Sequence, residues 1–514
     1  MEMQPRPESL WTASHGPARV PLSGDATVDV AVVGGGIVGL TAASLLQREG
    51  RRVAVIEARS VGRQTTGGSS AKVTAQHSLI YTRLTHTFGS DTARVYAQAN
   101  ASALDWIASR VASRGIRCSF ERHPAYVFTE DAGRIDDLKE ESRIAASLGL
   151  PARFTGDVPL PVPAVGAVVF DDQAQFDPYA YVLSEAQHFV DAGGLLFEDT
   201  RVNDVDTSMS RPRVVTERGT VSASDVVLAT NLPILDHGRY YARAFPIAHL
   251  AIAARVGGEA PDGVFISVDQ PTHSLRWHRD QRGDLWMLAL GPRFRPGTED
   301  TEQRFRELEA WARAYFPIAS VEYRWWNEDF QSADGIPYVG RLSADIEHLY
   351  VATGFSGWGI TNGVVAAQII ADTIAGRPNE WAKTFDSTRS VRMDSAGELI
   401  RGNLPSVKAW VTDHLKHPHA VDLSTLGTDE GLVVEVGGKA TGVSRDAEGA
   451  LHAVSAECSH RGCILGWNGA MCTWDCSCHG SSFDRDGHVL RGPAVSNLEP
   501  RSITASAAGG VASS

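Results

Sequence analysis

The 514-residue sequence lacks the features that define several common protein classes. No apolar run reaches the roughly eighteen to twenty residues of a membrane-spanning helix, so we expect no membrane span. Residues Met1–Pro7 contain neither the basic region nor the apolar core of a signal peptide, which favours a cytoplasmic protein. A net charge of −13 provides no basic surface for phosphate backbones, so we expect no nucleic-acid partner.

Cysteine is also scarce, and its distribution is uneven. Of six cysteines, five lie between Cys458 and Cys478, and Cys118 lies far from them. Such clustering indicates a metal site in a reducing compartment rather than the disulfide framework of a secreted protein. We expect Cys118 to be a small buried apolar residue and Cys472 to be a loop thiol.

The N-terminal region contains a glycine-rich turn between a strand and a helix. An apolar strand ending at Val33 leads into the G-x-G-x-x-G motif Gly34–Gly39, and apolar residues with helical spacing follow. A second strand, Arg52–Ile56, ends at Glu57, eighteen residues past Gly39. The glycines let a pyrophosphate approach the helix N-terminus, and the acid can accept hydrogen bonds from ribose hydroxyls. The order of these elements predicts a dinucleotide site, and because no second such motif follows, a nicotinamide coenzyme is not expected.

Near the C-terminus, a C-x-H motif at Cys458–His460 is followed by a C-x-x-H motif at Cys476–His479. Two thiolates and two imidazoles suit a 2Fe-2S cluster in which one iron takes the cysteines and the other takes the histidines. The predicted ligands are Cys458, His460, Cys476 and His479. A zinc site is the alternative, although zinc sites usually pair C-x2–4-C with H-x3–5-H.

Residues 25–380 resemble the D-amino-acid oxidase, glycine oxidase and sarcosine oxidase superfamily of FAD-dependent enzymes. The resemblance rests on the opening βαβ unit, the strand ending at Thr230, and the motifs Asp334–Gly340 and Ala352–Gly359. It implies FAD as the resident cofactor and hydride removal from a carbon that bears an amine or a similar group. The cofactor-binding residues it implies are Gly34, Gly36, Ile37, Val38, Gly39, Glu57, Ala58, Thr66, Ser69, Ser70, Arg201, Val202, Ala229, Thr230, Gly354, Gly357, Trp358, Gly359, Ile360 and Thr361.

The catalytic residues are not fixed by this resemblance. Lys72 and His77 follow a small-residue loop near the expected flavin edge, so either is a candidate base, and a structural hydrogen-bonding role is the alternative for each. The helix that begins after Gly357–Gly359 would direct its N-terminal dipole at a reduced flavin ring.

Several positions depart from the superfamily pattern. Ala75 and Ser78 stand where sarcosine-oxidase-like members place arginines that bind a substrate carboxylate, so an amino acid held in that way is not expected. Ala289 stands where family oxidases carry a lysine that helps flavin react with oxygen. Loss of that charge would disfavour superoxide formation, so we do not expect oxygen to be the acceptor. Trp358 replaces the histidine of a Gly-His-Gly turn found in many relatives.

The last ninety or so residues resemble the Rieske iron–sulfur domain. The resemblance implies a disulfide between Cys463 and Cys478 that joins the two ligand loops, and a covering loop at Gly492–Ala494. It places the Ser481 hydroxyl near a cluster sulfur and puts Phe483 where high-potential members have a tyrosine. Loss of that hydroxyl predicts a potential below the top of the Rieske range of roughly −150 to +300 mV.

The predicted fold is an α/β FAD-binding Rossmann-like domain with an inserted antiparallel-sheet substrate domain, followed by an all-β Rieske domain. The expected divisions are an N-terminal extension (1–26), an FAD-dependent oxidoreductase (27–380), a helical linker (381–420), a Rieske domain (421–508) and a disordered tail (509–514). Within the oxidoreductase we expect FAD-binding segments at about 27–95, 194–235 and 335–380, and substrate-domain segments at about 96–193 and 236–334.

Two groups of residues invite a functional interpretation but favour a structural one. The first group is a set of candidate metal ligands in the linker: Asp413, His414, His417 and His419. We favour the alternative, in which these residues form an exposed polar stretch. Aromatics on alternating strand positions are usually core rather than pocket residues, and we expect this of Trp277, His278, Trp325 and Trp326.

The combination of cofactors predicts a dehydrogenase. FAD would take a hydride from a small amine, amino acid or related substrate, and the cluster would pass single electrons to a carrier protein or a quinone-like acceptor. Two alternatives stay open: a flavin reductase that a ferredoxin-like donor feeds through the cluster, and a non-catalytic redox sensor.

Overall fold

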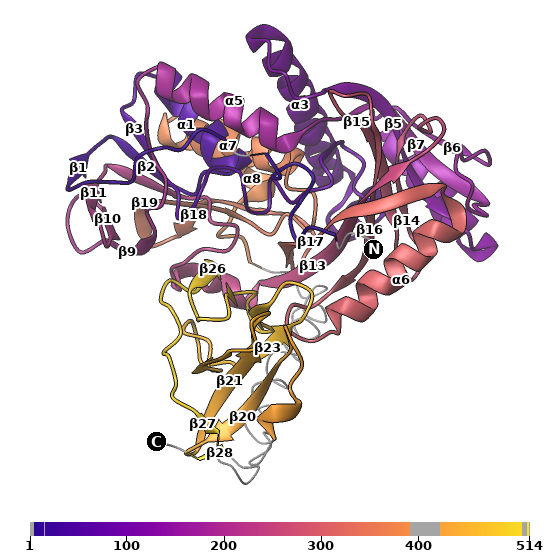
Figure 1. Cartoon of the computed structure of the whole chain (residues 1–514). Coiled ribbons are helices and arrows are strands. Elements are labelled where there is room, and N and C mark those ends of the chain that lie inside the picture. Colours follow the sequence, from indigo (N-terminus) through magenta and orange to yellow (C-terminus); the bar gives the residue numbers. More distant parts are fainter. Residues whose placement is uncertain (1–4, 15, 391–421, 506–510, 513–514) are drawn as a thin grey trace.

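The computed structural model describes residues 5–14, 16–390, 422–505 and 511–512. One domain, on the left in Figure 1, is built on a six-stranded sheet. The strand order is β18 (Tyr338–Ser343), β19 (Ile346–Thr353), β12 (Asp225–Leu228), β2 (Val30–Val33), β3 (Val53–Ile56) and β8 (Leu195–Phe197). All neighbours are parallel except β18 and β19. Parallel neighbours need long crossovers, which is why one sheet collects strands from three distant segments.

Both faces of this sheet are buried, because alternate side chains of each strand point to opposite sides. Val30 and Val32 of β2 face a cluster that contains α1 (Ile37–Arg48), α5 (Pro178–Asp191) and α7 (Thr361–Ile374). Ala31 and Val33 face a cluster that contains the second, four-stranded sheet. That sheet has the order β1 (Ala26–Thr27), β11 (Gly219–Ser222), β10 (Arg213–Thr216), β9 (Val202–Asp206). The result is a three-layer domain of helices, sheet and sheet.

A nine-stranded sheet forms the second domain. Its order is β17 (Ile318–Ser332), β13 (Ala244–Val256), β16 (Leu285–Phe294), β15 (Ser274–Arg279), β14 (Val264–Ser267), β5 (Glu121–Thr129), β7 (Gly166–Gln175) and β4 (Lys72–Val73), with β6 (Ala152–Thr155) beside β7. The predicted antiparallel sheet is confirmed, with one parallel pair between β14 and β5. Helices α4 (Ile135–Ser147) and α6 (Thr301–Tyr315) pack on this sheet. Helix α2 (Ile80–Phe88) packs on α4, α3 (Ser90–Arg114) packs on α2 and α7, and α8 (Ala382–Phe385) packs on β18.

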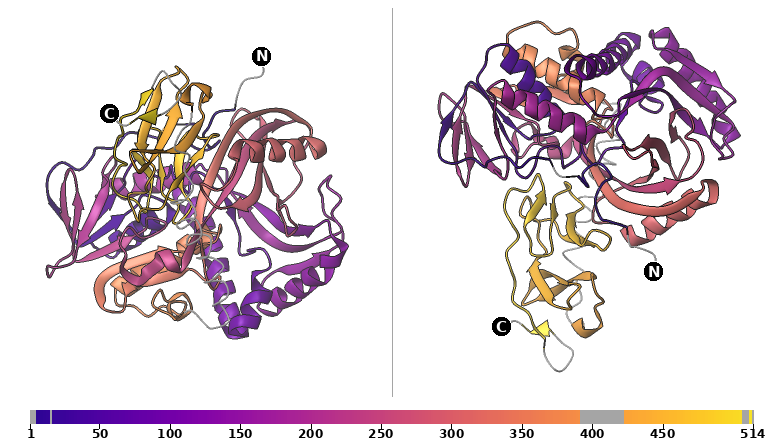
Figure 2. Two further views of the ribbon diagram at one scale, coloured as in Figure 1. Left: turned by 90° about the horizontal axis from the view of Figure 1, so that it is seen from below. Right: turned by 45° about the horizontal axis from the view of Figure 1, so that its top comes forward.

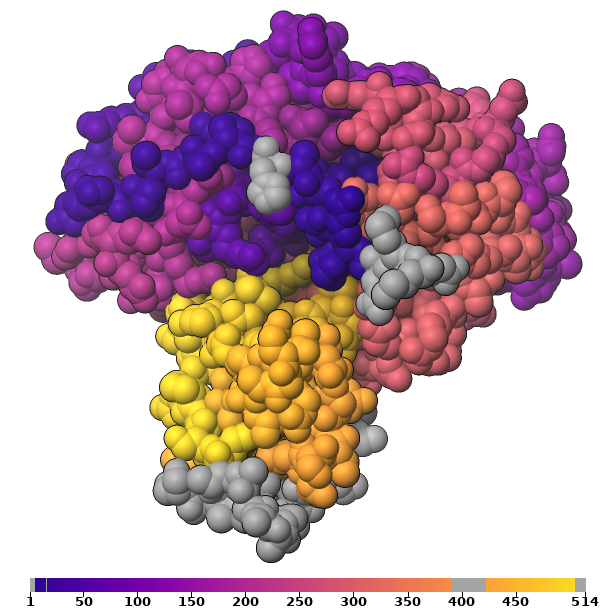
Figure 3. Space-filling view, in the orientation of Figure 1, coloured from indigo at the N-terminus to yellow at the C-terminus, as the bar shows by residue number. Residues whose placement is uncertain are grey.

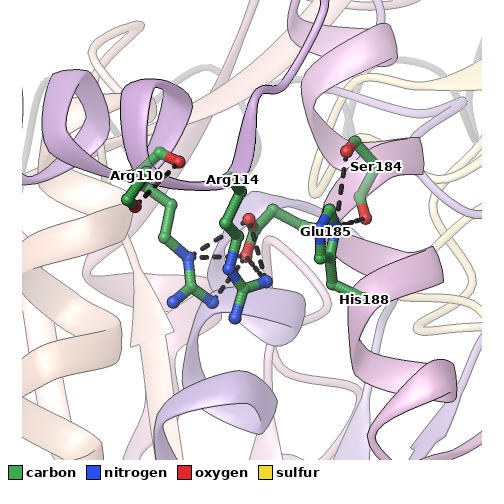
Figure 4. Close-up of polar contacts among 6 residues, drawn as sticks. Arg110, Arg114, Ser184, Glu185 and His188 are labelled. Atoms are coloured by element: carbon green, nitrogen blue, oxygen red, sulfur yellow. Dashed lines mark hydrogen bonds and ion pairs between the residues drawn. The ribbon is translucent and has the colours of Figure 1, made fainter.

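Helix α5 belongs to the FAD-binding layers, although the sequence suggested a substrate domain up to residue 193. It packs against α1, and its Glu185 carboxylate accepts hydrogen bonds from Arg110 and Arg114 of α3 (Figure 4). The Arg110 and Glu185 side chains are only 4% and 1% exposed. Removing one partner of such a pair would leave a buried charge, at a typical cost of about 3–5 kcal/mol. Helical periodicity predicts an amphipathic helix but not which sheet it covers.

The C-terminal domain is all-β, as predicted, and forms a separate lobe beneath the other two domains in Figure 3 and in the right-hand view of Figure 2. One sheet contains β20 (Gly431–Val436), β21 (Lys439–Arg445) and β22 (Leu451–Ser455). The other contains β23 (Leu465–Asn468), β24 (Thr473–Cys476), β25 (Ser482–Phe483) and β26 (Val489–Arg491). Trp474 is fully buried between the ligand loops and the strands.

The chain ends differ from the sequence-based divisions. The expected N-terminal extension is part of the fold: Trp11 is 3% exposed, and β1 pairs with β11. At the other end, β28 (Val511–Ala512) pairs with β27 (Thr504–Ala505), where we expected disorder; such backbone pairing needs no apolar side chains. Residues 391–421, which include the predicted linker helix and the four linker residues Asp413, His414, His417 and His419, lie outside the described residues. None of the described helices is long and apolar enough to span a membrane.

Candidate functional site

A long cavity lies at the carboxyl ends of the parallel strands. Gly34 follows β2, Glu57 follows β3, Ala229 follows β12 and Phe355 follows β19, and all four line the cavity. Ligands of open α/β sheets bind at this edge, because loops rather than strands form its surface.

At one end, the glycine-rich turn brings backbone close to the cavity. Gly34 has φ +109°, and a Cβ there would lie 2.5 Å from the Ala229 carbonyl oxygen. Gly36 precedes α1 and has no side chain to cap the helix, so an anion can bind N–H groups of the first turn. The Ile37 N–H is already used, because it donates to Thr66 Oγ1 at 3.2 Å.

Glu57 sits beside this turn as a buried carboxyl. Its Oε2 accepts from the Gly35 N–H at 2.8 Å and its Oε1 from the Arg59 N–H at 3.0 Å. Burial raises the pKa of Glu57, while these two hydrogen bonds and Arg201 oppose the rise. Each carboxylate oxygen has a second lone pair, so Glu57 can still accept hydrogen bonds from ribose hydroxyls.

At the other end, His77 supports the turn before α7. Its Nε2–H donates to the Thr74 carbonyl at 2.9 Å, so its Nδ1 accepts from the Tyr96 hydroxyl at 2.7 Å. The ring stacks on Trp358 with centroids 4.8 Å apart. Burial lowers the pKa of His77 to about 3. Because both ring nitrogens are hydrogen-bonded, this geometry favours the structural role of His77 over the catalytic one.

Lys72, on β4, extends into the cavity from the neighbouring sheet. Its Nζ donates to the Phe265 carbonyl at 2.5 Å and to Ser274 Oγ at 2.6 Å. Burial, assisted by the positive charge of Arg276, lowers the pKa of Lys72 to about 7. A lysine with such a pKa can accept a proton at neutral pH.

Three further polar residues of the cavity carry no recognisable sequence signal. Asp329 Oδ2 accepts from the Gly357 N–H at 2.6 Å, and burial raises its pKa to about 6. Arg293 donates to the Ser356 carbonyl at 2.9 Å. His249 lies beside Gly357, and burial lowers its pKa to about 3.

The four predicted cluster ligands meet at the tip of the C-terminal domain. Cys458 and Cys476 are buried thiols that share a hydrogen bond, which lowers the pKa of Cys458 to about 7. The His460 and His479 rings lie 4.9 Å apart between centroids. Among the described residues, neither Nδ1 atom has a hydrogen-bond partner although both are buried. Two thiols and two open imidazole nitrogens fit a cluster with cysteine on one iron and histidine on the other.

The predicted disulfide between Cys463 and Cys478 is confirmed. Cys476 Sγ lies within 4.8 Å of both disulfide sulfurs, so the bond fixes one ligand loop beside the other. Ser481 is fully buried, and its hydroxyl accepts from the Ala494 N–H at 3.0 Å. Phe483 is fully buried in the domain core.

The C-terminal domain also forms part of the cavity wall. Residues Leu490, Arg491, Gly492, Ala494 and Val495 line the cavity together with the glycine-rich turn. Two hydrogen bonds hold this wall in place. Gln64 Nε2 donates to the Leu490 carbonyl at 3.0 Å, and Arg201 Nη2 donates to the Val489 carbonyl at 2.9 Å.

A buried carboxyl lies at this junction. Glu328 lines the cavity, and burial raises its pKa well above the usual range, partly offset by Arg491. A Cβ at Gly480 would overlap Glu328 Oε1, so glycine is required where the second ligand loop passes. Arg491 stacks over Trp326 at 4.1 Å.

Comparisons with known proteins agree with this geometry. The family model described as FAD dependent oxidoreductase matches residues 29–373, and the model of the Rieske [2Fe-2S] domain matches residues 418–502. The chain belongs to the FAD-dependent oxidoreductase family. It carries a C-terminal Rieske domain, and its cofactors are FAD and a 2Fe-2S cluster.

Individual relatives extend this result. Bacillus subtilis (strain 168) YhfW, whose name describes a Rieske 2Fe-2S iron-sulfur protein, is 33% identical over 497 residues, covering 96% of this chain and 97% of that protein. Gamma-glutamylputrescine oxidoreductase of Escherichia coli (strain K12) is 24% identical over 376 residues, covering 70% and 86%. The structure of glycine oxidase from Geobacillus kaustophilus superposes with a TM-score of 0.59 at 19% identity, covering 71% and 100%.

Most of the residues predicted to bind FAD line the cavity, and two do not. Gly39 and Gly354 are not among the lining residues. A Cβ at Gly39 would overlap the Gly34 carbonyl, so this glycine permits close packing of helix and turn. Gly354 has φ +80° and packs against Ser332.

The four aromatic residues that we expected to be core rather than pocket residues do not line the cavity. Trp277 and Trp326 belong to the apolar cluster on the α6 side of the nine-stranded sheet. Trp325 Nε1 donates to the Gly68 carbonyl at 2.8 Å and thereby holds the loop that reaches the cavity. The ring of His278 packs on Trp11 with centroids 5.0 Å apart. Cys118 is 1% exposed and lies in the core, as predicted.

The expectation that Ala289 stands at the cavity position of the family lysine needs correction. Ala289 does not line the cavity; it faces the apolar cluster with its strand partners Ile252 and Leu275. Leu290 lines the cavity instead. Strand alternation places Ala289 and Leu290 on opposite faces of β16, and the pairing with β13 stays regular at both residues, so a shift of one residue in the assigned position exchanges core for cavity. The expectation that oxygen is not the acceptor stays a prediction from the sequence.

Proposed function

We propose that this family member is a dehydrogenase of a small amine, amino acid or related substrate. It passes the electrons singly through its Rieske cluster to a one-electron carrier protein or a quinone-like acceptor. One observation carries this proposal: the wall formed by Leu490–Val495 belongs to the Rieske domain and also borders the cavity of the FAD-dependent domain. A wall that both sites share supports direct electron exchange between the two cofactors. The amine in the name of the E. coli relative supports a substrate of that class.

The residues around the cavity have distinct proposed tasks. The glycine-rich turn and Glu57 hold the adenosine and pyrophosphate, and Trp358, fixed by His77, borders the flavin end. When bound, FAD accepts the hydride and the cluster carries one electron at a time. Lys72 Nζ is the candidate that accepts the proton of a substrate ammonium, since a neutral amine loses hydride more readily than a charged one. The cytoplasmic location stays a prediction from the sequence.

Anaerobic mixing of the holoenzyme with a panel of amines and amino acids tests the proposal. Flavin and cluster absorbance are followed together. A substrate should bleach the flavin first and the cluster afterwards. Flavin bleaching without any cluster reduction contradicts the proposed electron path, and bleaching of neither cofactor by any compound favours a redox sensor.

Measured reduction potentials decide the direction of flow. A cluster potential above that of the flavin agrees with export of electrons. A cluster potential well below that of the flavin contradicts it and favours a reductase that an external donor feeds through the cluster.

A further inference from the structure

One segment of the FAD-dependent domain reaches from the cavity to the cluster ligands. It begins after β12, and Thr230, Asn231 and Ile234 line the cavity. Asp236 follows two residues after Ile234, and the short helix η2 (His237–Ala242) comes next. Asp236 is therefore two residues, and Tyr241 seven residues, from the last cavity-lining residue of this segment.

The side of the cluster site that carries His460 and His479, here called the histidine edge, lies against this segment. Asp236 Oδ2 accepts from Arg461 Nη2 at 2.6 Å, and Asp236 Oδ1 lies 3.7 Å from His460 Nε2. The Tyr241 ring meets the His479 ring edge to face, with centroids 5.7 Å apart. The Arg461 guanidinium lies over the Tyr241 ring at 4.1 Å. Both ligand histidines thus touch side chains from the same short segment.

Other contacts hold the two domains together. Arg295 donates to the carbonyls of Ser477 and Cys478, next to the second ligand motif. The buried Thr301 hydroxyl donates to Asn468 Oδ1 at 2.7 Å. Asp236 and Arg461, in contrast, are 58% and 38% exposed, and exposed ion pairs typically contribute only about 0–1 kcal/mol. Changes at Asp236 should therefore leave the domains docked.

The histidine edge is also the electronically relevant side of the cluster. Imidazoles are neutral ligands and thiolates are negative, so the iron with two histidines is the easier one to reduce. The side chain of His460 is 11% exposed and residue His479 is 8% exposed. This edge is covered by the protein's own FAD-dependent domain.

We propose that the segment Thr230–Tyr241 is the electron-transfer contact between the FAD site and the cluster. Asp236 and Tyr241 are positioning residues that keep the histidine edge against it. The inference rests on the proposed function, in which electrons move between FAD and cluster. Each transfer oxidises reduced FAD by one electron and converts one ferric ion of the cluster to ferrous. The flavin proton leaves to solvent, and a one-electron acceptor must reoxidise the cluster before the second electron follows.

Pulse reduction of the oxidised holoenzyme with a viologen radical provides a test that needs no substrate. After the pulse, electrons redistribute between flavin and cluster in a phase whose rate does not depend on protein concentration. Asp236→Arg and Arg461→Asp should each slow this phase about tenfold or more, because like charges then separate the edge from the segment. The double variant Asp236→Arg/Arg461→Asp should return to within about threefold of wild type.

Two aromatic variants and a distant variant complete the set. Tyr241→Leu should slow the phase, whereas Tyr241→Phe keeps the ring and should not. Asp262→Asn removes an exposed carboxylate that pairs with His123 at 2.8 Å, far from the cluster site, and should have no effect. FAD content and the electron paramagnetic resonance signal of the cluster report whether each variant keeps both cofactors.

The outcomes separate the inference from the proposed function. If the wild-type protein shows no redistribution phase, the proposed function itself fails. If it does, and Asp236→Arg and Tyr241→Leu with both cofactors bound redistribute electrons at the wild-type rate, the segment is not the contact. If the single variants slow the phase and the double variant Asp236→Arg/Arg461→Asp does not restore its rate, the pairing role of Asp236 is also overturned.

Discussion

The FAD cavity and the cluster site are built in contrasting ways. The cluster ligands come from two loops between Cys458 and His479, and each ligand is one side chain with a unique task. The cavity walls extend along the chain from Val33 to Val495, and many of the contributing groups are backbone atoms or small side chains. A local site of few ligands should fail completely when one is lost. A distributed site should lose affinity by degrees.

The largest effect should follow removal of one cluster ligand. In Cys476→Ser, we expect complete loss of the cluster, because a hydroxyl does not replace a thiolate on iron. FAD should remain bound, since most of its site lies in other domains. Iron analysis and flavin absorbance measure the two contents. Cys472→Ser is the matched control, because this partly exposed thiol lies outside the ligand set. A cluster present at normal content in Cys476→Ser would refute the ligand assignment.

The next effect concerns chemistry at the cavity. We expect Lys72→Met to slow flavin reduction by an amine substrate about 10²–10⁴-fold, the usual contribution of a positioned base. In the wild type, the rate of flavin reduction should rise with pH through about 7 and then level off, because the neutral lysine is the proton acceptor. Rapid-mixing kinetics across pH measure this. A Lys72→Met protein that keeps the same pH profile would show that another group accepts the proton. Lys72→Arg should be slow as well, since arginine stays protonated.

A smaller, graded effect is expected within the distributed site. Gly34→Ala forces a Cβ into the left-handed region and toward the Ala229 carbonyl, which should cost about 2–3 kcal/mol of stability and weaken FAD binding. Gly24 also has a positive φ, +83°, but open space around it, so Gly24→Ala isolates the backbone strain at about 1 kcal/mol. Thermal unfolding and FAD content measure both. Equal losses in the two variants would mean that the close approach to Ala229 is unimportant.

The same contrast explains what sequence could predict. The ligand motifs and the Gly34–Glu57 unit are local, so their spacing alone points to their chemistry. The roles of Arg293, His249 and Asp329 depend on which strands are neighbours in the nine-stranded sheet, and no local pattern encodes that. The displaced assignment at Ala289 has a related origin, because side chains alternate along β16 and a shift of one residue exchanges the core face for the cavity face.

Docking of the Rieske domain was likewise beyond sequence analysis. The loop Gly492–Ala494 resembles a cluster cover, but its second task as a cavity wall depends on contacts such as Arg295 with the Ser477 carbonyl. These contacts join residues far apart in the chain. Single-sequence patterns contain no information on such complementarity between domains.

The smallest effect should occur at the junction of the two sites. Burial raises the pKa of Glu328, so we expect a protonated carboxyl that Gln can replace with a change below about 0.5 kcal/mol. If Glu328 instead forms a buried ion pair with Arg491, Glu328→Gln should cost about 3–5 kcal/mol. Thermal unfolding distinguishes these two cases. Glu322→Gln, in a partly exposed pair with Arg255, is the comparison for a carboxyl group in an ion pair.

The shared wall has a consequence for the biosynthesis of the protein. Chains emerge from the ribosome with the N-terminus first, so the glycine-rich turn, α1 and α7 are complete before Leu490–Val495 exist. During synthesis the cavity is open on this side, and it gains its last wall when the C-terminal domain docks. FAD that is already in place is then enclosed, which makes the order of cofactor loading a property of the chain order itself.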